Sequence, residues 1–385
     1  MTKPLDQRTA SFLFALVLSI VLCVTAILYG GQAPADEPLK TESTAIIHEP
    51  EFGGVYITIT IEDFNALGFE YGDSVDVVFS NGYRMDDIPY FSGYYVDVGE
   101  PLLIAYPGYD YIKAAVNYGA DVWETGQLNE DDTAEIRLRE RGKYLDTQKA
   151  RDIHYYDERE RYDNDVSFAN FRNIRMGSLK EGILYRSASP CDNQHNRAPY
   201  ADALMKEAGV LCVLDLADTG EKIDGYIAKE DFNSPWFLSL YEKGQVIPLA
   251  MSMNFASEEF TSKIAQGFTA MSEFPGPYLV HCTEGKDRTG FVCMLIEALA
   301  GASYQEIVDD YMKTYDEYYR INEASDPERY RLILEKNLLP MIRFVAGDDT
   351  VDITTADLAP LARDFLVRCG MTEAQIDRFL ARITG

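Results

Sequence analysis

One short polar segment combines a cysteine and an arginine at a spacing suited to phosphoryl chemistry. Five residues separate Cys282 from Arg288, and the segment with its flanks reads His281-Cys282-Thr283-Glu284-Gly285-Lys286-Asp287-Arg288-Thr289-Gly290. A thiolate is a strong nucleophile, and the planar guanidinium of arginine can hold two oxygens of a phosphoryl group. This pair therefore predicts attack of Cys282 on a phosphate ester that Arg288 binds.

The surrounding pattern places this segment between a strand and a helix. Residues 278–280 are predicted to form a strand, and the apolar run 291–300, closed by Gly301, is predicted to form a buried helix. Such a loop can turn successive N–H groups toward an anion at the helix N-terminus. We therefore expect a field that favours the thiolate of Cys282, and phosphate binding by Thr283, Glu284, Gly285, Lys286, Asp287 and Arg288.

Two flanking residues are candidates for supporting roles. His281 precedes the nucleophile and could fix the loop through a backbone hydrogen bond. Thr289 follows the arginine, and its hydroxyl could donate a hydrogen bond to the thiolate when the sulfur leaves. A packing role is the alternative for both side chains.

The motif HCxxGKDRTG resembles the protein tyrosine phosphatase superfamily, and its GKDRTG form is similar to atypical bacterial tyrosine and dual-specificity (lipid) phosphatases. The resemblance spans roughly residues 165–385. One departure is Ala217, where this family often has an arginine after an Asp-Leu pair, so a second basic contact is in doubt. The other matching positions are Asn170-Phe171-Arg172, Leu184-Tyr185-Arg186-Ser187, Asp215-Leu216 and Asp310-Tyr311.

The resemblance implies hydrolysis of phosphate monoesters through a cysteinyl-phosphate, without a metal or other cofactor. A carboxylic acid then protonates the leaving oxygen and later serves as a base. Related bacterial enzymes carry this acid inside the loop, which corresponds to Asp287, while Asp218 and Glu221 are the alternatives. Phosphotyrosine in a protein or peptide is the expected substrate, and Lys286 adds phosphoinositides as a second possibility.

A binding protein is the competing functional class. A catalytically inactive phosphatase-like module could bind phosphorylated ligands at the cell surface. The intact pair of Cys282 and Arg288 favours an enzyme, because a binding-only module has no need for a nucleophile. Of the other cysteines, Cys212 and Cys293 lie in apolar runs typical of a core, whereas Cys191 is either a plain loop residue or a redox partner of Cys282.

Composition excludes one class of partner. The chain has 385 residues, 46% hydrophobic and 25% charged, which is typical of globular domains, and its formal net charge is −28. Such a charge repels nucleic acid, so we expect no nucleic-acid partner. Any phosphate site in this chain must therefore be locally basic.

The N-terminus predicts export. Residues 11–30 form a run without a charge, and this run is long enough for a membrane helix. Lys3 and Arg8 precede it. The positive-inside rule then places the remainder outside the cytoplasm. Residues 1–35 are expected to be an uncleaved signal anchor in the cell membrane, or a signal peptide cleaved near Ala33-Pro34-Ala35 that leaves a secreted protein.

The remaining chain divides by periodicity. A polar spacer is expected over 35–50, a small β-rich domain of unknown partner over 45–128, and a charged linker over 129–165. The β-rich domain has strand-like runs at 55–61, 74–79, 93–98 and 102–105.

Residues 166–385 are expected to form an α/β phosphatase domain, with a central, mostly parallel sheet flanked by helices. Its first two strands are predicted at 182–185 and 210–214, with a helix at 199–208 between them. Capping boxes at Ser303/Glu306 and Thr372/Gln375 predict two helix starts.

Overall fold

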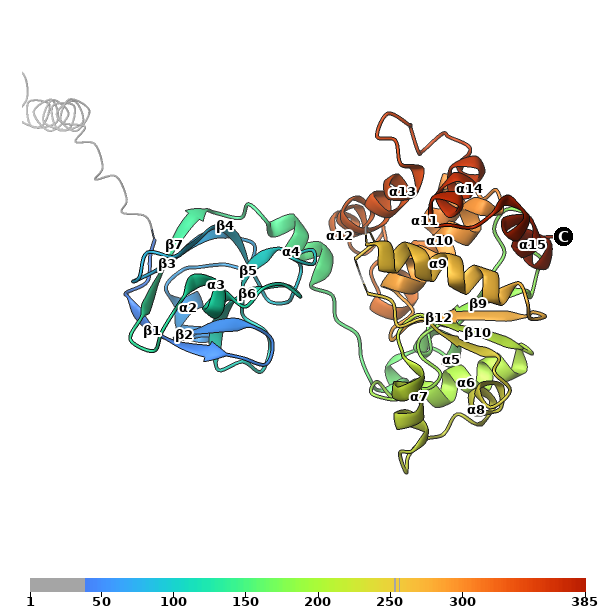
Figure 1. Cartoon of the computed structure of the whole chain (residues 1–385), viewed down its shortest axis with the longest axis horizontal. Helices are drawn as coiled ribbons and strands as arrows, with labels where there is room; N and C mark the ends of the chain where they lie inside the picture. The colour runs from blue at the N-terminus through green and yellow to red at the C-terminus, as the bar shows by residue number, and fades with distance from the viewer. Residues whose placement is uncertain (1–38, 253, 256) are drawn as a thin grey trace, which may run out of the picture.

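The computed structural model describes residues 39–385 apart from 253 and 256. The predicted membrane segment 11–30, the cleavage motif and Cys23 lie outside these residues. Among the helices that the structure describes, none has the length and apolar character needed to cross a bilayer. The described chain forms two sheets, which Figure 1 shows as separate bodies with a helix, α4, between them.

The N-terminal sheet is a closed barrel of seven strands in the order β1-β2-β6-β5-β4-β3-β7. Closure pairs the first strand with the last, which leaves no free sheet edge. Short helices α2 (Ile61–Ala66) and α3 (Val122–Gly126) pack against β2 and β6. The strands are β1 (Thr44–Glu49), β2 (Gly54–Thr60), β3 (Ser74–Phe79), β4 (Arg84–Phe91), β5 (Pro101–Ile104), β6 (Tyr111–Val116) and β7 (Thr133–Glu140).

Three sequence expectations for this region are corrected. Part of the expected spacer is strand β1, and part of the expected linker is strand β7, so the barrel extends past residue 128. Segment 93–98 is a loop, in which Asn117 Nδ2 donates to the carbonyl oxygen of Val96 at 2.8 Å. Strand β1 overlaps the polar segment 35–50 and β7 lies in a charged segment, and the two strands pair only through barrel closure.

The second sheet has five strands in the order β11-β10-β12-β9-β8. As predicted it is mostly parallel, and only β8 runs antiparallel to its neighbour. Its strands are β8 (Arg172–Ile174), β9 (Leu184–Ser187), β10 (Cys212–Asp215), β11 (Val246–Pro248) and β12 (Tyr278–His281). The predicted strands correspond to β9, β10 and β12, whereas β8 and β11, each three residues long, were not predicted.

Alternate residues of the central strands face two helical layers. Cys212, Leu214 and Val280 pack with α9 and α10, whereas Val213 and Leu279 pack with α6 and α8. The helices after β7 are α4 (Leu145–Arg151), η1 (Arg159–Arg161), α5 (Asp165–Phe168), α6 (Ala198–Glu207), α7 (Gly220–Ile227), α8 (Pro235–Tyr241), α9 (Glu258–Met271), α10 (Asp287–Leu299), α11 (Tyr304–Tyr319), α12 (Pro327–Ile333), η2 (Leu334–Leu338), α13 (Leu339–Ala346), α14 (Leu358–Arg368) and α15 (Glu373–Ile383).

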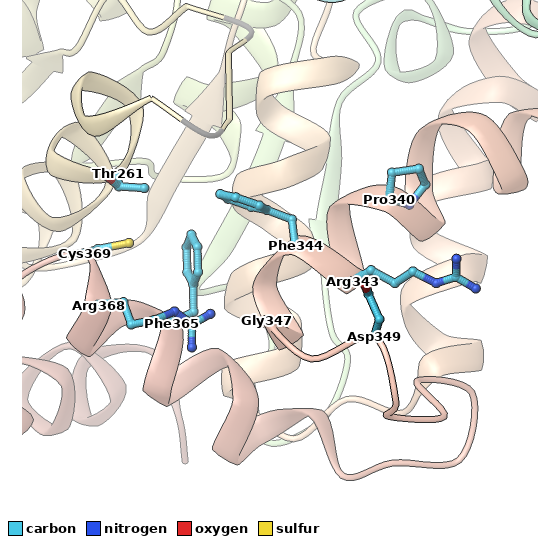
Figure 2. A pocket seen from close by; sticks show the side chains of 9 residues that line it. All are labelled: Thr261, Pro340, Arg343, Phe344, Gly347, Asp349, Phe365, Arg368 and Cys369. Carbon is cyan, nitrogen blue, oxygen red and sulfur yellow. The ribbon is translucent and has the colours of Figure 1, made fainter.

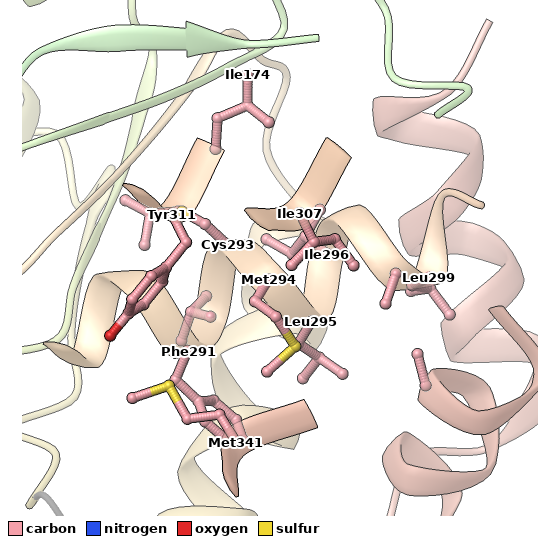
Figure 3. Packing of buried hydrophobic residues seen from close by; sticks show 14 of the residues in the cluster. Ile174, Phe291, Cys293, Met294, Leu295, Ile296, Leu299, Ile307, Tyr311 and Met341 are labelled. Atoms are coloured by element: carbon pink, nitrogen blue, oxygen red, sulfur yellow. The ribbon is translucent and has the colours of Figure 1, made fainter. Parts of the chain in front are cut away.

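Helix α10 is the centre of the larger core. It is buried on every side from Thr289 to Leu299, which agrees with a sequence that is apolar over this stretch except at Thr289 and Glu297. Figure 3 shows Phe291 and Leu295 of this helix among side chains of neighbouring elements, including Tyr311 and Met341. A helix fixed in this way holds the loop before it rigidly.

The predicted helix boundaries are confirmed at several positions. Ser303 with Glu306, and Thr372 with Gln375, form complete capping boxes at the starts of α11 and α15. Gly301 follows the end of α10 with φ +81°. Helix α10 begins at Asp287, four residues before the predicted start at 291, because the last residues of the loop already have helical geometry.

Candidate active site

The cysteine loop lies at the carboxyl end of β12, the middle strand of the five-stranded sheet. Cys282 follows the strand directly and is 3% exposed, and Asp287 begins helix α10. Ligands of parallel α/β sheets bind outside the carboxyl ends of their strands. The predicted strand, loop and helix therefore follow one another at the edge of the sheet where ligands of this fold class bind.

The carbonyl groups of the loop are bound from outside. Ser189 N donates to Thr283 O at 3.0 Å, and Asn170 Nδ2 donates to Glu284 O at 3.0 Å. Arg186 Nη2 donates to Gly285 O at 2.9 Å. These three contacts fix the peptide planes, so the opposite side of each plane, with its N–H, faces the loop interior.

The backbone N–H groups of the loop remain available. Between Thr283 and Arg288, none of them donates a hydrogen bond to another residue that the structure describes. They precede the N-terminus of α10, whose dipole adds positive potential. Consecutive free amides at a helix start form an anion-binding nest.

Gly285 is required by the geometry of this loop. Its φ is +73°, in the left-handed region that side chains disfavour. A Cβ atom there would lie 2.3 Å from the carbonyl oxygen of Ser187. No other residue fits this position without moving strand β9.

Arg288 folds back over the loop. Its Nη2 atom donates to Thr283 Oγ1 at 3.3 Å, and its Nη1 atom donates to Met251 O at 3.2 Å. The guanidinium therefore spans from the last residue of the loop to the first residue after Cys282. This is the position from which it can bind a phosphoryl group held by the loop amides.

A buried ionic network supports the loop from behind. Asp310 accepts from Arg172 Nε at 2.7 Å and from Arg186 Nη1 at 2.7 Å, and Arg172 Nη1 donates to Asn170 Oδ1 at 3.0 Å. Burial alone would raise the pKa of Asp310, but the two guanidinium groups hold it well below its ordinary value. Arg186 and Asn170 each also bind a loop carbonyl, so the network positions the loop directly.

Of the two residues expected to support the loop, His281 makes a backbone contact, whereas Thr289 makes no described hydrogen bond through its hydroxyl. His281 Nδ1 lies 3.4 Å from Cys282 O, a backbone contact of the expected kind. Burial lowers the pKa of His281 to about 4, so its ring is neutral at pH 7. The expected hydrogen bond from Thr289 to the sulfur is absent among the described contacts: the hydroxyl is buried in the first turn of α10 and has no described partner.

Two loop side chains make polar contacts near its rim. Lys286 Nζ lies 2.8 Å from both carboxylate oxygens of Asp287, whose side chain is 37% exposed. Burial would raise the pKa of Asp287, but the charge and the hydrogen bond of Lys286, together with the charges of Arg151 and Arg288, lower the value overall. Glu284 accepts from the Tyr319 hydroxyl at 2.7 Å, so its carboxylate is turned toward α11.

The alternative acids lie on the loop after β10. Asp218 is buried, accepts from the Tyr226 hydroxyl at 3.2 Å, and burial raises its pKa to about 6. Its neighbour Asp215 is fully buried, and burial raises its pKa to about 7. Glu221 is exposed in the first turn of α7.

The described cysteines are all buried and form no disulfide with one another. Cys191 contacts Ser189 Oγ at 3.4 Å and lies beside Asp215 and Asp218. Burial raises the pKa of its thiol well above the ordinary value, which disfavours thiolate chemistry at this position. Cys212 and Cys293 are core residues.

Sequence reasoning missed several residues that shape the site. Ser189, Tyr319 and Met251 contact the loop or its arginine, but they lie in segments without a recognisable local pattern. Their roles depend on contacts between distant parts of the chain. A single sequence read by its local patterns gives no signal for such contacts.

A separate cavity of about 560 Å³ lies between α9, α13 and α14 (Figure 2). Phe344 and Phe365 supply apolar surface, and Arg343 and Arg368 supply charge. None of its lining residues belongs to the cysteine loop. The cavity is therefore distinct from the cysteine loop.

Comparisons with known proteins agree with the α/β fold. A family model described as "Tyrosine phosphatase family" matches residues 167–381. No curated protein matches the chain.

Solved structures give partial matches. An uncharacterized conserved protein from Thermotoga maritima is 25% identical, with 28% of this chain and 39% of that chain covered and a TM-score of 0.22. A cysteine-to-serine variant of P. aeruginosa TpbA, in complex with pTyr, is 14% identical and has a TM-score of 0.27; the match covers 50% of this chain and 88% of that chain. The core catalytic domain of the PP-IP phosphatase SIW14 from S. cerevisiae, in complex with citrate, is 18% identical and has a TM-score of 0.26; the match covers 46% of this chain and 91% of that chain. The match thus spans about two fifths of the Thermotoga protein.

Proposed function

Because this chain belongs to the tyrosine phosphatase family, we propose that it hydrolyses phosphate monoesters through a cysteinyl-phosphate on Cys282. Phosphotyrosine in a protein or peptide is the proposed substrate, and phosphoinositides are the second possibility. An anchor in residues 1–35 would place this activity on the extracytoplasmic side of the cell membrane.

The observation that carries this proposal is the set of free amides between Thr283 and Arg288. The carbonyl groups of the same loop accept hydrogen bonds from Ser189, Asn170 and Arg186, while its N–H groups have no described acceptor. A phosphoryl group supplies the missing acceptors. Arg288, already directed across the loop, adds a charge-assisted contact that strengthens as charge develops in the transition state.

The proposed reaction has two steps. The Sγ atom of Cys282 attacks phosphorus, the bond from phosphorus to the ester oxygen breaks, and a carboxylic acid gives its proton to that oxygen. Water then attacks the cysteinyl-phosphate and gives a proton to the resulting carboxylate. Inorganic phosphate leaves, and the thiolate of Cys282 is restored.

We propose Asp287 as the acid, because it is the accessible candidate within the loop. Its carboxylate is 37% exposed, whereas Asp218 is 3% exposed and accepts from Tyr226. In the free protein Lys286 keeps Asp287 ionised. A bound phosphate dianion attracts Lys286 and repels a second negative charge, and both effects favour the protonated carboxyl.

The test is phosphate release by the full chain from phosphotyrosine peptide, phosphoserine peptide and phosphoinositide. Cys282→Ser and Arg288→Ala are expected to lose activity by several orders of magnitude, and Arg175→Gln, an exposed arginine that pairs with Glu181, serves as the control. Binding of the phosphorylated ligands without turnover by the wild type would identify an inactive binding module instead.

A further inference from the structure

Three potential metal ligands lie together beside the carboxyl end of β10. They are the thiol of Cys191 and the carboxylates of Asp215 and Asp218, and one ligand atom from each lies within 4.8 Å of the other two. All three side chains are buried. Asp215 ends β10 and Asp218 follows three residues later, whereas Cys191 comes from the segment after β9. The fold thus brings two separate segments together at this group.

Each of the two carboxylates has one buried oxygen without a partner. Asp215 Oδ1 accepts from the backbone N–H groups of Ala217 and Asp218 at 2.9 and 3.1 Å. Asp218 Oδ1 accepts from the Tyr226 hydroxyl at 3.2 Å. The second oxygens, Asp215 Oδ2 and Asp218 Oδ2, are buried and accept no hydrogen bond from a residue that the structure describes. Buried polar atoms normally have a partner, so these two oxygens need a donor or a cation.

His281 has an unpaired nitrogen at the same place. Its ring is fully buried, and its Nε2 atom lies 3.8 Å from Asp215 Oδ2 without a hydrogen-bond partner in the described chain. The contact between Nδ1 and Cys282 O at 3.4 Å assigns the ring proton to Nδ1, which leaves a lone pair on Nε2. Two acceptors therefore lie close together with no donor between them. A cation bound to both would satisfy them.

A small cavity adjoins this group. Its volume is about 140 Å³, and its lining includes Cys191 and Tyr226, the hydrogen-bond partner of Asp218. The lining also includes Ser234, whose buried hydroxyl has no described partner. This volume is large enough for several water molecules or for a partly hydrated ion. The cavity therefore supplies the space through which an ion can approach Cys191.

We propose that Cys191, Asp215 and Asp218 bind a Zn²⁺ ion, and that His281 completes the site as its fourth ligand. Thiolate and imidazole ligands select zinc over calcium and magnesium, which prefer oxygen. The contact of His281 Nδ1 with a backbone carbonyl oxygen is the usual way in which a zinc-binding histidine is oriented.

The distances require a small closure of the group. Tetrahedral zinc, with bonds of about 2.0–2.3 Å, needs ligand atoms about 3.3–3.8 Å apart. The 3.8 Å between His281 Nε2 and Asp215 Oδ2 is at the upper end of this range. The other ligand atoms, at separations of up to 4.8 Å, must approach one another by about 1 Å, which side-chain rotation can supply.

A bound cation would change the protonation of this group. In the metal-free chain, burial raises the pKa of Asp215 to about 7 and that of Asp218 to about 6, and it raises the pKa of Cys191 well above its ordinary value. These shifts, and the pH dependence that follows from them, describe the chain without a bound cation. Zinc reverses them, because it binds the thiolate and the carboxylates in their ionised forms.

The ion would join two segments that contact the cysteine loop and its arginine. Ser189 N, two residues before Cys191, donates to Thr283 O at 3.0 Å. Leu216 O, between the two aspartates in the chain, lies 3.5 Å from Arg288 Nη1. Zinc would fix these segments relative to each other and would take no part in the proposed reaction. The inference therefore does not depend on the proposed phosphatase function.

The test uses the full chain with the background substitution Cys282→Ser, so that the thiol of the cysteine loop cannot bind metal. The protein is stripped with a chelator, incubated with Zn²⁺ and freed of loosely bound ions, and its metal content is measured by mass spectrometry. We expect one tightly bound zinc ion per chain. Cys191→Ala, and Asp218→Asn, which keeps an acceptor for Tyr226, should each weaken zinc binding at least about tenfold. Cys369→Ala, which removes a buried thiol outside the group, is the matched control and should retain the ion.

Two further measurements report the sulfur ligand and the fold of the variants. Cobalt in place of zinc should give a sulfur-to-cobalt charge-transfer absorption that Cys191→Ala abolishes and Cys369→Ala keeps. Zinc should raise the Tm of the parent and of the Cys369→Ala control but not that of Cys191→Ala. The Tm of each variant in chelator shows whether it remains folded, and Asp218→Asn decides the test if Cys191→Ala does not fold.

Three results would overturn the proposal. The first is a parent chain that retains no zinc, since buried water would then account for the unpaired oxygens. The second is equal zinc binding by the parent, Cys191→Ala and Asp218→Asn, which would place the ion elsewhere on this acidic chain. The third is preferential binding of Ca²⁺ or Mg²⁺, because those ions have little use for a sulfur ligand.

Discussion

The guanidinium of Arg186 donates a hydrogen bond of 2.9 Å to the carbonyl oxygen of Gly285. The same side chain donates to Asp310 at 2.7 Å, so one buried arginine connects the phosphate nest to helix α11. Both the conformation of the cysteine loop and the stability of the core therefore depend on Arg186. Substitutions that remove only one of its two contacts can separate these effects.

Arg186→Lys should separate these effects. A lysine can keep the ion pair with Asp310, but its single nitrogen replaces the two, Nη1 and Nη2, with which Arg186 reaches Asp310 and Gly285 separately. We expect kcat/KM on an aryl phosphate to fall at least tenfold with a modest loss of stability. Arg186→Ala leaves Asp310 with one guanidinium and should cost about 3–5 kcal/mol of unfolding free energy. Calorimetry and steady-state kinetics measure both, and full activity of Arg186→Lys would contradict the role of the Gly285 contact.

Gly285→Ala should damage the nest locally. The new Cβ would meet Ser187 O at 2.3 Å, at a backbone φ of +73°. The strain is about 1–3 kcal/mol, and the backbone must shift to relieve it. We expect activity to fall by more than a hundredfold, with the fold retained in circular dichroism. Gly225→Ala, in α7 with open space around the Cβ position, is the matched control.

The identity of the acid can be read from pH profiles. The first step needs a protonated acid, so kcat/KM falls as the pH rises through the pKa of that acid. Asp218, with a pKa raised by burial to about 6, would give a decline centred near pH 6, whereas Asp287, with a lowered pKa, places it at lower pH. We expect Asp287→Asn to cost roughly 10²–10⁴-fold on alkyl phosphates. A larger loss in Asp218→Asn would reverse the assignment.

Stability should depend on Asp218 in a pH-dependent manner. Burial raises the pKa of this carboxyl from 3.8 to about 6, so the folded chain binds its proton more tightly than the unfolded chain. The stabilising contribution is complete below pH 3.8 and is lost as the pH rises through about 6. We expect Asp218→Asn, which keeps an acceptor for Tyr226, to raise Tm at pH 8 and change it little at pH 4. Equal changes at both values would argue against the shift.

The barrel contains a buried ion pair whose two partners should respond unequally. Lys113 is fully buried, its Nζ atom lies 3.0 Å from Glu49 Oε2, and it faces four aromatic rings. Glu49→Gln leaves this cation without its counter-ion and should cost about 3–5 kcal/mol. Lys113→Met removes the charge and keeps the apolar stem, so its cost should be smaller. Urea unfolding of the full chain compares the two, and a larger cost for Lys113→Met would contradict this ranking.

Local sequence patterns predicted the core of the site but not its surroundings. The strand before Cys282, the helix after it and the capping boxes of α11 and α15 follow from apolar periodicity and side-chain chemistry within a few residues. The buried partners Arg172, Arg186 and Asp310 were indicated only by family resemblance, because no periodicity distinguishes them from surface charges.

Contacts between distant segments account for the remaining differences. Strands β1 and β7 pair with each other only when the barrel closes, and the polar and charged segments in which they lie suggested a spacer and a linker. Arg151 stands in a run of charges that is typical of a solvated face. Its Nε atom is buried, and α4 packs against α12, a contact that no local pattern encodes.

The Asp310 network also has a consequence for the order in which the protein acquires its activity during synthesis. The ribosome delivers Cys282 and Arg288 before Asp310, and Arg172 and Arg186 cannot be neutralised until helix α11 has emerged and docked. A nascent chain therefore carries the proposed nucleophile before it carries the carboxylate that organises the surrounding loop. We therefore expect the proposed phosphatase activity to begin only after helix α11 has been translated.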